Sequence, residues 1–232
     1  LYAATGDAKW AEILEKAAFN ALPATFSDDM WVHQYDQMVN QISATHFDGK
    51  PIFRTNGGDS NMFGLEPNFG CCTANGGQGF PKLALSSFMR SSRGIENVVP
   101  IPSELHDDGV HIILDTDYPF ENRLTYTVKT DRDLDFTVRL PRGTKNVSVD
   151  GKPAETKFHF SAGSDVKIEI TFDTDPGYVT GENGLTCVES GSLVFSVPIS
   201  YRKVMHEYVR DNVERKFPYC DYEYLPTSDW NY

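Results

Sequence analysis

Basic residues and cysteines are both scarce in this sequence of 232 residues. Lys and Arg number 21 against 33 Asp and Glu, so the formal net charge is −12. Nucleic acids and anionic membranes are bound through basic surface, and this balance therefore argues against both as partners, while it suits a neutral ligand. The four cysteines are too few for a scaffold stapled by disulfides.

Long apolar runs, internal repeats and low-complexity stretches are missing as well. A helix that spans a bilayer needs roughly 20 mainly apolar residues, and no stretch comes close, so the sequence predicts a soluble chain. No signal-peptide pattern opens it, which leaves the compartment undecided. Because the chain starts at Leu1 without a methionine and stops just after Trp230, we expect a piece of a larger protein; a processed mature chain is the alternative.

Residues 7–22 predict an amphipathic helix, with Asp7 as its N-cap and Pro23 as its stop. One buried face is expected from the apolar residues at helical spacing, which are Trp10, Ile13, Leu14, Ala17, Ala18, Ala21 and Leu22. Glu15 and Lys16 are expected on the opposite, solvent-facing side. This broad apolar stripe must pack against another part of the protein.

A second helix is predicted over residues 73–92, with its regular part beginning near Pro81 and Gly94 as its C-terminal stop. A long glycine-containing loop over residues 54–70 precedes it. Long ordered loops are commonly functional, so this segment is a candidate for the surroundings of a site.

After Val98 the pattern changes to short alternating runs that are typical of strands. The runs cover residues 110–114, 124–129, 134–140, 147–149, 166–172 and 193–199. Asp150-Gly151 is a strong hairpin signal. The two halves together predict an α+β chain, with a helical part over residues 1–97 and an antiparallel β-sandwich over residues 98–232.

Cys71 and Cys72 are adjacent and precede a predicted helix. A helix N-terminus favours negative charge, so it is expected to lower the pKa of a thiol there, and a thiolate can act as a nucleophile or as a soft metal ligand. Buried, inert cysteines are the plain alternative. Glu66 is the carboxylate nearest to the pair in the sequence, and we expect it on the loop surface.

The run from Gly70 to Lys82, GCCTANGGQGFPK, resembles the double-cysteine motif of glycoside hydrolase family 127, which includes the β-L-arabinofuranosidases. Weaker similarities to this family lie at residues 5–7, 15–23, 33–35, 191–195 and 228–232, so the resemblance covers nearly the whole chain. It implies the end of an (α/α)6 barrel followed by a β-sandwich, and a retaining glycosidase that uses a zinc-bound cysteine.

The resemblance also implies roles for individual residues. Cys71 would be the nucleophile and a zinc ligand, and Cys72 would be a second zinc ligand. This is chemically consistent, because zinc keeps a thiol deprotonated at neutral pH. His33 and Tyr35 would line the sugar pocket, and the favoured alternative is a core histidine beside a packed tyrosine.

The sequence departs from the family pattern in one respect. The remaining zinc ligands of the family lie in a Glu-x-Cys motif, and its acid/base glutamate also precedes the matching segment, but this chain has no Glu-x-Cys. We therefore expect half of a zinc site, no activity of this chain alone, and the missing N-terminal part of the same barrel as its partner. The whole protein would act on L-arabinofuranosides or related glycans. A non-catalytic carbohydrate-binding or structural β-sandwich module and a purely structural zinc site stay open as alternatives.

Overall fold

The computed structural model describes residues 1–232 except 48–54, 65–69, 93, 182–183, 209–218 and 231–232. Glu66 and the last two residues of the 228–232 similarity therefore lie outside the described residues. The chain forms two compact units. Unit 1 comprises Leu1–Phe19, Phe80–Gly177 and Ser190–Leu193, and unit 2 comprises Asn20–Gly79, Tyr178–Glu189 and Val194–Tyr232. The chain thus passes between the units several times, whereas the sequence predicted one boundary, between residues 97 and 98; that boundary stays a prediction about the whole protein.

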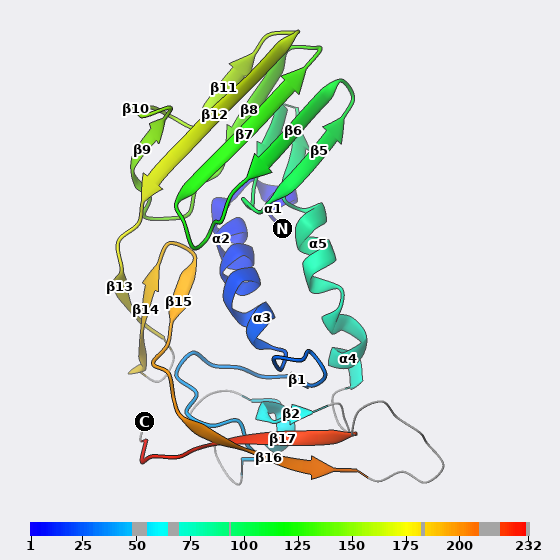
Figure 1. The fold of residues 1–232 in the computed structure, drawn as a ribbon, viewed down its shortest axis with the longest axis vertical. Coiled ribbons are helices and arrows are strands. Elements are labelled where there is room, and N and C mark those ends of the chain that lie inside the picture. The colour runs from blue at the N-terminus through cyan, green and yellow to red at the C-terminus, as the bar shows by residue number, and fades with distance from the viewer. Residues whose placement is uncertain (48–54, 65–69, 93, 182–183, 209–218, 231–232) are drawn as a thin grey trace. The chain divides into compact units, whose positions relative to one another are not determined.

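Strands outnumber helices in the described residues (Figure 1). The helices are α1 Tyr2–Thr5, α2 Ala8–Lys16, the π-helical turn Ala17–Ala21, α3 Leu22–Ala24, the 3-10 turn Gly58–Asn61, α4 Gly70–Gly76 and α5 Gly79–Leu85. The strands are β1 His33–Gln34, β2 Phe63–Gly64, β3 Phe88–Ser91, β4 Gly94–Asn97, β5 Ser103–Asp107, β6 Val110–Asp115, β7 Arg123–Thr130, β8 Leu134–Val138, β9 Lys145–Val149, β10 Lys152–Pro153, β11 Lys157–Phe160, β12 Ser164–Asp173, β13 Gly177–Thr180, β14 Thr186–Ser190, β15 Leu193–Phe195, β16 Tyr201–Glu207 and β17 Cys220–Pro226.

Two sheets of unit 1 share one hydrophobic core. One sheet has the strand order β10-β9-β12-β7-β6-β5 (Figure 1). The other has the order β11-β8-β4-β3. Tyr126 of the first sheet meets Phe136 of the second edge to face, with ring centroids 5.3 Å apart, and both side chains are fully buried. Burial of large side chains like these supplies most of the stabilisation of such a core.

The alternating runs of the sequence form strands because one face of each strand enters this core. In β6, Val110, Ile112 and Leu114 are buried while the residues between them face outward. The hairpin signal is confirmed too. Asp150 and Gly151 adopt φ angles of 49° and 75° between β9 and β10, as a tight hairpin turn requires.

The prediction of one helix over residues 73–92 is wrong. The helical part ends with α5 at Leu85, and the chain then forms β3 and β4. Gly94 is the first residue of β4, opposite Ser91 of β3, and its φ is 127°, so it belongs to a hairpin and does not end a helix. Strand β4 lies before the predicted antiparallel part and runs parallel to β8, with Ile95 opposite Phe136.

The first helix was predicted correctly at its start, since the Asp7 side chain accepts a hydrogen bond from the Lys9 N–H at 3.1 Å. Its predicted stop is wrong, because Pro23 lies inside α3. Its predicted buried face is only partly right, since Ala18 is buried and Leu14 packs on a small core. Glu15 is fully buried, whereas Ile13 is 58% exposed.

The buried Glu15 carboxylate has an ion-pair partner that the spacing of residues in the sequence could not reveal. Arg139, which follows β8, forms an ion pair with the Glu15 carboxylate inside unit 1. The Arg139 Nε also donates a hydrogen bond of 2.6 Å to the Val98 carbonyl. Ala11, on the same face of α2, packs in a small core with Val98 and Val99. The charge pair therefore sets which side of α2 faces inward.

Replacement of Gly94 by alanine is expected to destabilise unit 1 by about 2–4 kcal/mol. A Cβ at Gly94 would lie 2.0 Å from the backbone oxygen of Asp135, and the φ of 127° is strained for any L side chain. Urea denaturation followed by circular dichroism measures the effect. Gly143→Ala is the matched control, because its φ is 79° but its Cβ would meet nothing within 4 Å, and we expect about 1 kcal/mol there. Equal losses for both variants would contradict the close packing of β4 on β8.

Unit 2 contains a four-stranded sheet of order β1-β2-β17-β16, and β13, β14 and β15 form a further sheet. The pair β16 and β17 is long and antiparallel, running from Tyr201 opposite Pro226 to Glu207 opposite Cys220. The short strands β1 and β2 continue this sheet, with Asp221 of β17 opposite Gly64 of β2. This sheet carries the segment that contains His33.

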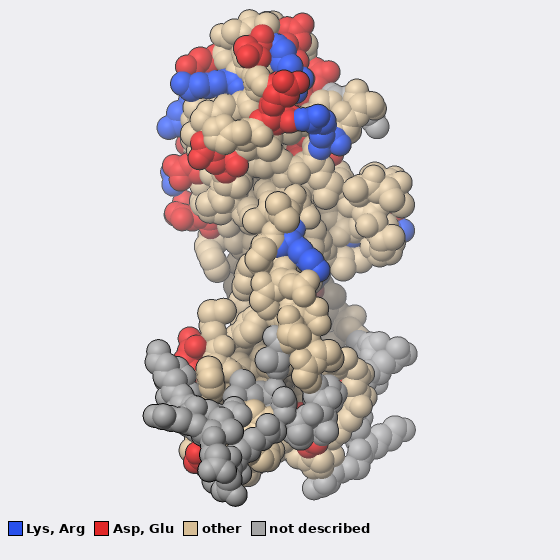
Figure 2. Space-filling view, turned by 90° about the vertical axis from the view of Figure 1, so that its right-hand side faces the viewer, with Lys and Arg blue, Asp and Glu red and all other residues tan. Residues whose placement is uncertain are grey.

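Charges of both signs are mixed on the surface of unit 1. Figure 2 shows basic and acidic side chains interspersed over the upper part of the face it presents. Exposed pairs such as Lys129 with Asp165 and Arg123 with Glu121, each at 3.0 Å, contribute to this pattern. Among the described residues, no helix has the length and apolar character needed to cross a membrane.

Candidate functional site

Cys71 and Cys72 lie in the first turn of α4 in unit 2. Their Sγ atoms are 3.8 Å apart, Cys71 is exposed, and Cys72 is half-buried. The Asn75 side-chain amide donates a hydrogen bond of 2.7 Å to the Cys71 carbonyl one turn earlier, which fixes the turn that carries both thiols. One thiol is therefore open to a reactant while its neighbour is held beside it.

The glycines of the motif allow this turn to pack closely on the preceding helical segment. A Cβ at Gly76 would lie 3.0 Å from the Phe26 ring, and a Cβ at Gly79 would lie 2.6 Å from the Leu22 side chain. Any larger residue would push these neighbours away. The glycines thus position the thiols through packing.

The thiol of Cys72 is harder to ionise than a free cysteine. Its pKa is raised to about 11, chiefly by burial and then by the hydrogen bond with Cys71 and by electrostatic interactions with Cys71 and Asp36. The sequence predicted a lowered pKa at a helix N-terminus, and this prediction is wrong for Cys72. The helix is only a short one, so its dipole is outweighed by desolvation and by the acidic surroundings.

The spacing of the two thiols would allow both to bind one zinc ion. A zinc–sulfur bond of about 2.3 Å and a tetrahedral angle place two sulfur ligands about 3.8 Å apart, which matches the separation of these Sγ atoms. A bound cation would also offset the raised pKa, because a coordinating thiol is deprotonated. Two thiols supply half of a tetrahedral set, so further ligands are needed.

Asp36 is the described carboxylate whose charge acts on Cys72. Its Oδ2 accepts a hydrogen bond of 2.7 Å from the Asn56 N–H, and its own N–H donates to the Ser60 carbonyl at 2.9 Å. These bonds tie the segment after β1 to the segment before β2. The sequence did not single out Asp36, because it is 36 residues upstream of Cys72 and belongs to no spacing pattern.

The structure places His33 and Tyr35 on the β1 segment. His33 is 8% exposed, and its backbone pairs with Gly64 and with Phe26. Tyr35 is half-buried, and its N–H donates to the Ser60 carbonyl at 3.2 Å. The burial of His33 agrees with the core-histidine alternative, and a contact of either side chain with sugar stays a prediction.

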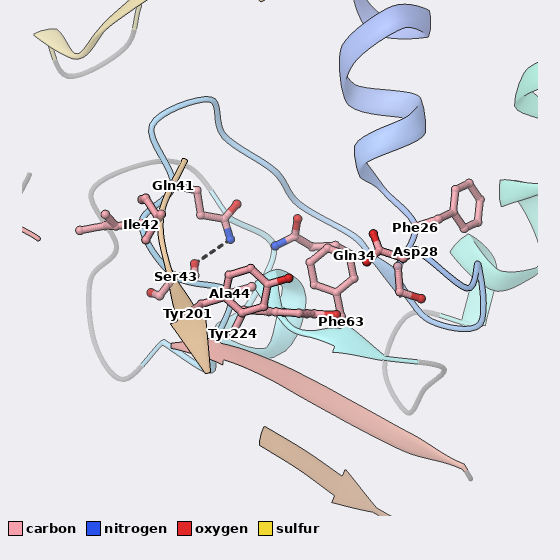
Figure 3. A pocket seen from close by; sticks show the side chains of 12 residues that line it. Phe26, Asp28, Gln34, Gln41, Ile42, Ser43, Ala44, Phe63, Tyr201 and Tyr224 are labelled. Atoms are coloured by element: carbon pink, nitrogen blue, oxygen red, sulfur yellow. Dashed lines mark hydrogen bonds between the residues drawn. The ribbon is translucent and has the colours of Figure 1, made fainter. Parts of the chain in front are cut away.

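A cavity of about 310 Å³ lies in unit 2 next to this segment (Figure 3). Three aromatic rings gather on one side of it. Tyr224 stands edge to face with Phe63 at 5.0 Å and with Tyr201 at 4.9 Å between centroids. Gln34 and Gln41 line it with amide groups, and Asp28 adds a carboxylate. Of the residues that the structure describes around the cavity, Gln34 is a lining residue, while His33 and Tyr35 on either side of it are not.

The chemistry of this cavity suits a neutral polyhydroxylated ligand. Aromatic rings cover the apolar faces of sugars, amides donate and accept hydrogen bonds, and the Asp28 carboxylate can accept them from hydroxyl groups. Burial raises the pKa of Tyr224 to about 12, so its hydroxyl keeps its proton and can donate. Sequence analysis missed Tyr201 and Tyr224, because they lie on strands far along the chain and their alternation carried no functional signal.

Comparison with solved structures reveals the same fold in glycoside hydrolases. A GH127 β-L-arabinofuranosidase from Geobacillus stearothermophilus T6 matches 97% of this chain with a TM-score of 0.63 and 13% sequence identity. A protein described as a glycoside hydrolase matches 96% with a TM-score of 0.65 and 14% identity. A GH127 β-arabinofuranosidase matches 97% with a TM-score of 0.58 and 18% identity. The predicted resemblance to family 127 is thereby confirmed at the level of the fold.

The matches cover only part of each related structure. This chain spans 44%, 46% and 44% of the lengths of those three proteins. No family model matches the chain, and no curated protein matches its sequence. The shared fold thus rests on the three-dimensional arrangement, in which sheets predominate and helices are few.

Proposed function

We propose that this chain is a portion of a retaining glycoside hydrolase of the family 127 type, with Cys71 as its nucleophile. The observation that carries the proposal is the side-by-side pair of thiols, 3.8 Å apart and partly exposed, within a fold shared with GH127 enzymes. The sequence motif from Gly70 to Lys82 supports the same assignment. L-arabinofuranosides or related glycans are the proposed substrates of the whole protein.

In this proposal residues 1–97 belong to the end of an (α/α)6 barrel and residues 98–232 form a β-sandwich. The neighbours are about twice as long as this chain, and the chain has no Glu-x-Cys motif. We therefore propose that further zinc ligands and the acid/base carboxylate come from residues outside these 232, and that this chain alone is inactive. A zinc ion bound by Cys71 and Cys72 would hold the thiols as thiolates.

The covalent chemistry assigned to Cys71 proceeds in two displacements. Its Sγ attacks the anomeric carbon, a C–S bond forms, and the C–O bond to the leaving group breaks while a carboxylic acid protonates the leaving oxygen. Water then attacks the same carbon, the C–S bond breaks, and the carboxylate takes the proton of the water. Two inversions leave the anomeric configuration unchanged, as in retaining enzymes that use two carboxylates.

A second candidate function is non-catalytic glycan binding, and the aromatic and amide lining of the unit 2 cavity favours it. In that case a neutral sugar would bind beside Tyr201 and Tyr224, and the cysteines would be inert. Binding that persists after both cysteines are replaced, and that is lost in Tyr224→Ala, would support this function over the first.

The zinc content of cysteine variants tests the first proposal. We expect the protein that includes the rest of the barrel to hold one zinc at the pair, and Cys71→Ala and Cys72→Ala each to lose it after dialysis, because each removes one of the four ligands of a tetrahedral site. Cys187→Ala is the matched control, since Cys187 is also half-buried and outside any disulfide but belongs to β14. Metal analysis by atomic emission gives the zinc content per chain.

The outcomes separate the alternatives. Zinc retained in Cys71→Ala and Cys72→Ala would exclude a thiol-bound ion and leave the glycan-binding module. Zinc lost together with the folded state would indicate a structural zinc site, so circular dichroism of each variant is recorded beside the metal content. Zinc lost with the fold intact supports the catalytic assignment.

A further inference from the structure

A second set of metal-ligating side chains lies in unit 1, on the hairpin formed by β5 and β6. Glu104, His106 and His111 each offer a ligand atom, and these three atoms lie within 4.8 Å of one another. Sequence analysis did not single them out, because Glu-x-His followed by a histidine five residues later is no recognised metal motif. The pairing of the strands brings them together.

The strand register explains why the three side chains meet. His106 of β5 is directly opposite His111 of β6, and Glu104 is opposite Ile113. Residues two apart in one strand share a face, so Glu104 and His106 point to the same side. His111 lies on the outward face of β6, since its neighbours Val110 and Ile112 are buried. Glu104 therefore reaches His111 across the diagonal of the hairpin.

Both histidine rings direct their Nε2 atoms at the same oxygen of Glu104. The rings are stacked, with centroids 4.2 Å apart and planes 14° from parallel. The His106 Nε2 lies 2.9 Å and the His111 Nε2 lies 2.6 Å from the same Oε1 of Glu104. Because an ionised carboxylate only accepts hydrogen bonds, each Nε2 faces it with a proton. A metal ion can take the place of these protons with the donor atoms already converged.

The local charges suit a cation. Glu104 brings a negative charge to the cluster, because an exposed glutamate is ionised at neutral pH. Lys129 is opposite His111 on β7, but its ammonium pairs with Asp165 at 3.0 Å. Asp107, the next residue after His106, is paired with Arg90. The nearby basic groups are thus engaged with carboxylates of their own.

We propose that Glu104, His106 and His111 form a binding site for a divalent transition-metal ion, separate from the cysteine pair. Two imidazoles and one carboxylate are a donor set typical of zinc, nickel and copper, and they leave a fourth position open. The side chains are 52%, 71% and 31% exposed, so an ion reaches them from solvent. A bound ion would cross-link the edge strand β5 to β6.

Isothermal titration with Zn²⁺ alone tests the site. The protein used is the full chain with Cys71→Ser and Cys72→Ser, which removes the thiols as competing ligands. We expect one zinc per chain, and we expect His106→Ala and His111→Ala each to weaken the affinity at least ~10-fold, because each removes one of three ligands. Binding is also expected to raise Tm, since the ion stabilises only the folded hairpin.

His159→Ala is the matched control, because His159 is also an exposed histidine of unit 1 that faces a carboxylate, Asp135, at 2.7 Å. Its affinity for zinc is expected to stay unchanged. The proposal is overturned if the chain without the cysteine pair binds no zinc, or if His159→Ala weakens binding as much as His106→Ala does. Glu104→Gln keeps the shape of the side chain and removes its charge, and it should weaken binding while the fold stays intact.

Discussion

Cys71→Ser, introduced into the protein that carries this chain, is expected to lower kcat/KM for an aryl β-L-arabinofuranoside at least ~10³-fold, as loss of a catalytic nucleophile does. The expectation rests on the proposed function and on the exposed Cys71 Sγ beside Cys72. A serine hydroxyl is much harder to deprotonate than a thiol and is a poorer ligand for a soft ion, so both the attack and the binding of the ion suffer.

Steady-state kinetics and a metal assay are measured on the same preparations. Cys187→Ser should keep wild-type turnover, because this thiol lies on β14 and outside the motif. Cys72→Ser should lose metal together with activity, whereas its Cys71 remains available to an alkylating reagent. A Cys71→Ser enzyme that retains turnover within ~10-fold would show that another group attacks the sugar, and the nucleophile assignment would then be withdrawn.

Glu15→Ala is expected to destabilise unit 1 by about 3–5 kcal/mol. Glu15 is fully buried, and the side chain of Arg139, its ion-pair partner, is 8% exposed. Removal of the carboxylate would leave the guanidinium charge buried without its partner, and Arg139 would also be less well placed to bond the Val98 carbonyl. Urea denaturation followed by circular dichroism gives the change in free energy of unfolding.

Two further variants distinguish the cost of leaving Arg139 unpaired from the net stabilisation that the Glu15–Arg139 ion pair provides. The double change Glu15→Leu with Arg139→Met replaces both charges by apolar groups, and it is expected to cost much less than Glu15→Ala, because no charge is left alone. Glu121→Ala is the exposed control. Its partner Arg123 is 55% exposed, and such pairs contribute about 0–1 kcal/mol. A loss below about 1 kcal/mol for Glu15→Ala would mean that water or another group compensates Arg139.

Local sequence patterns predicted the β-rich part of unit 1 well. Strands β6, β7, β9 and β12 occur where apolar residues alternate, since one face of each enters the core. The turn at Asp150-Gly151 was predictable because few residues accept the positive φ angles that a tight hairpin needs. These signals depend on residues that are close together in the sequence, so they can be interpreted without the tertiary structure.

Predictions failed where contacts between residues far apart in the sequence determine the local structure. Phe88–Ser91 was expected in a helix but forms β3, because it pairs with β4, which in turn pairs with β8. Glu15 was expected in solvent and is buried, because Arg139 meets it from 124 residues away. Neither partner can be inferred from helical or strand periodicity.

The candidate sites likewise combine features that neighbouring residues determine with features that depend on distant contacts. The cysteine pair was predicted because Cys71 and Cys72 are adjacent and belong to a motif that can be read in one dimension. Its electrostatics were not, since burial and Asp36 raise the pKa of Cys72. The aromatic cavity of unit 2 and the Glu104, His106 and His111 cluster were invisible in the sequence, because strand pairing assembles both.

The sequence by itself therefore determined the strand-forming segments, the tight turns and the adjacent thiols, since each depends on neighbouring residues and on their own stereochemistry. Tertiary structure decided which face of α2 is buried, how β4 joins β8, and which side chains surround each site. These features depend on contacts between segments that lie far apart in the chain, and such contacts form only when burial of apolar surface and pairing of buried charges are satisfied together.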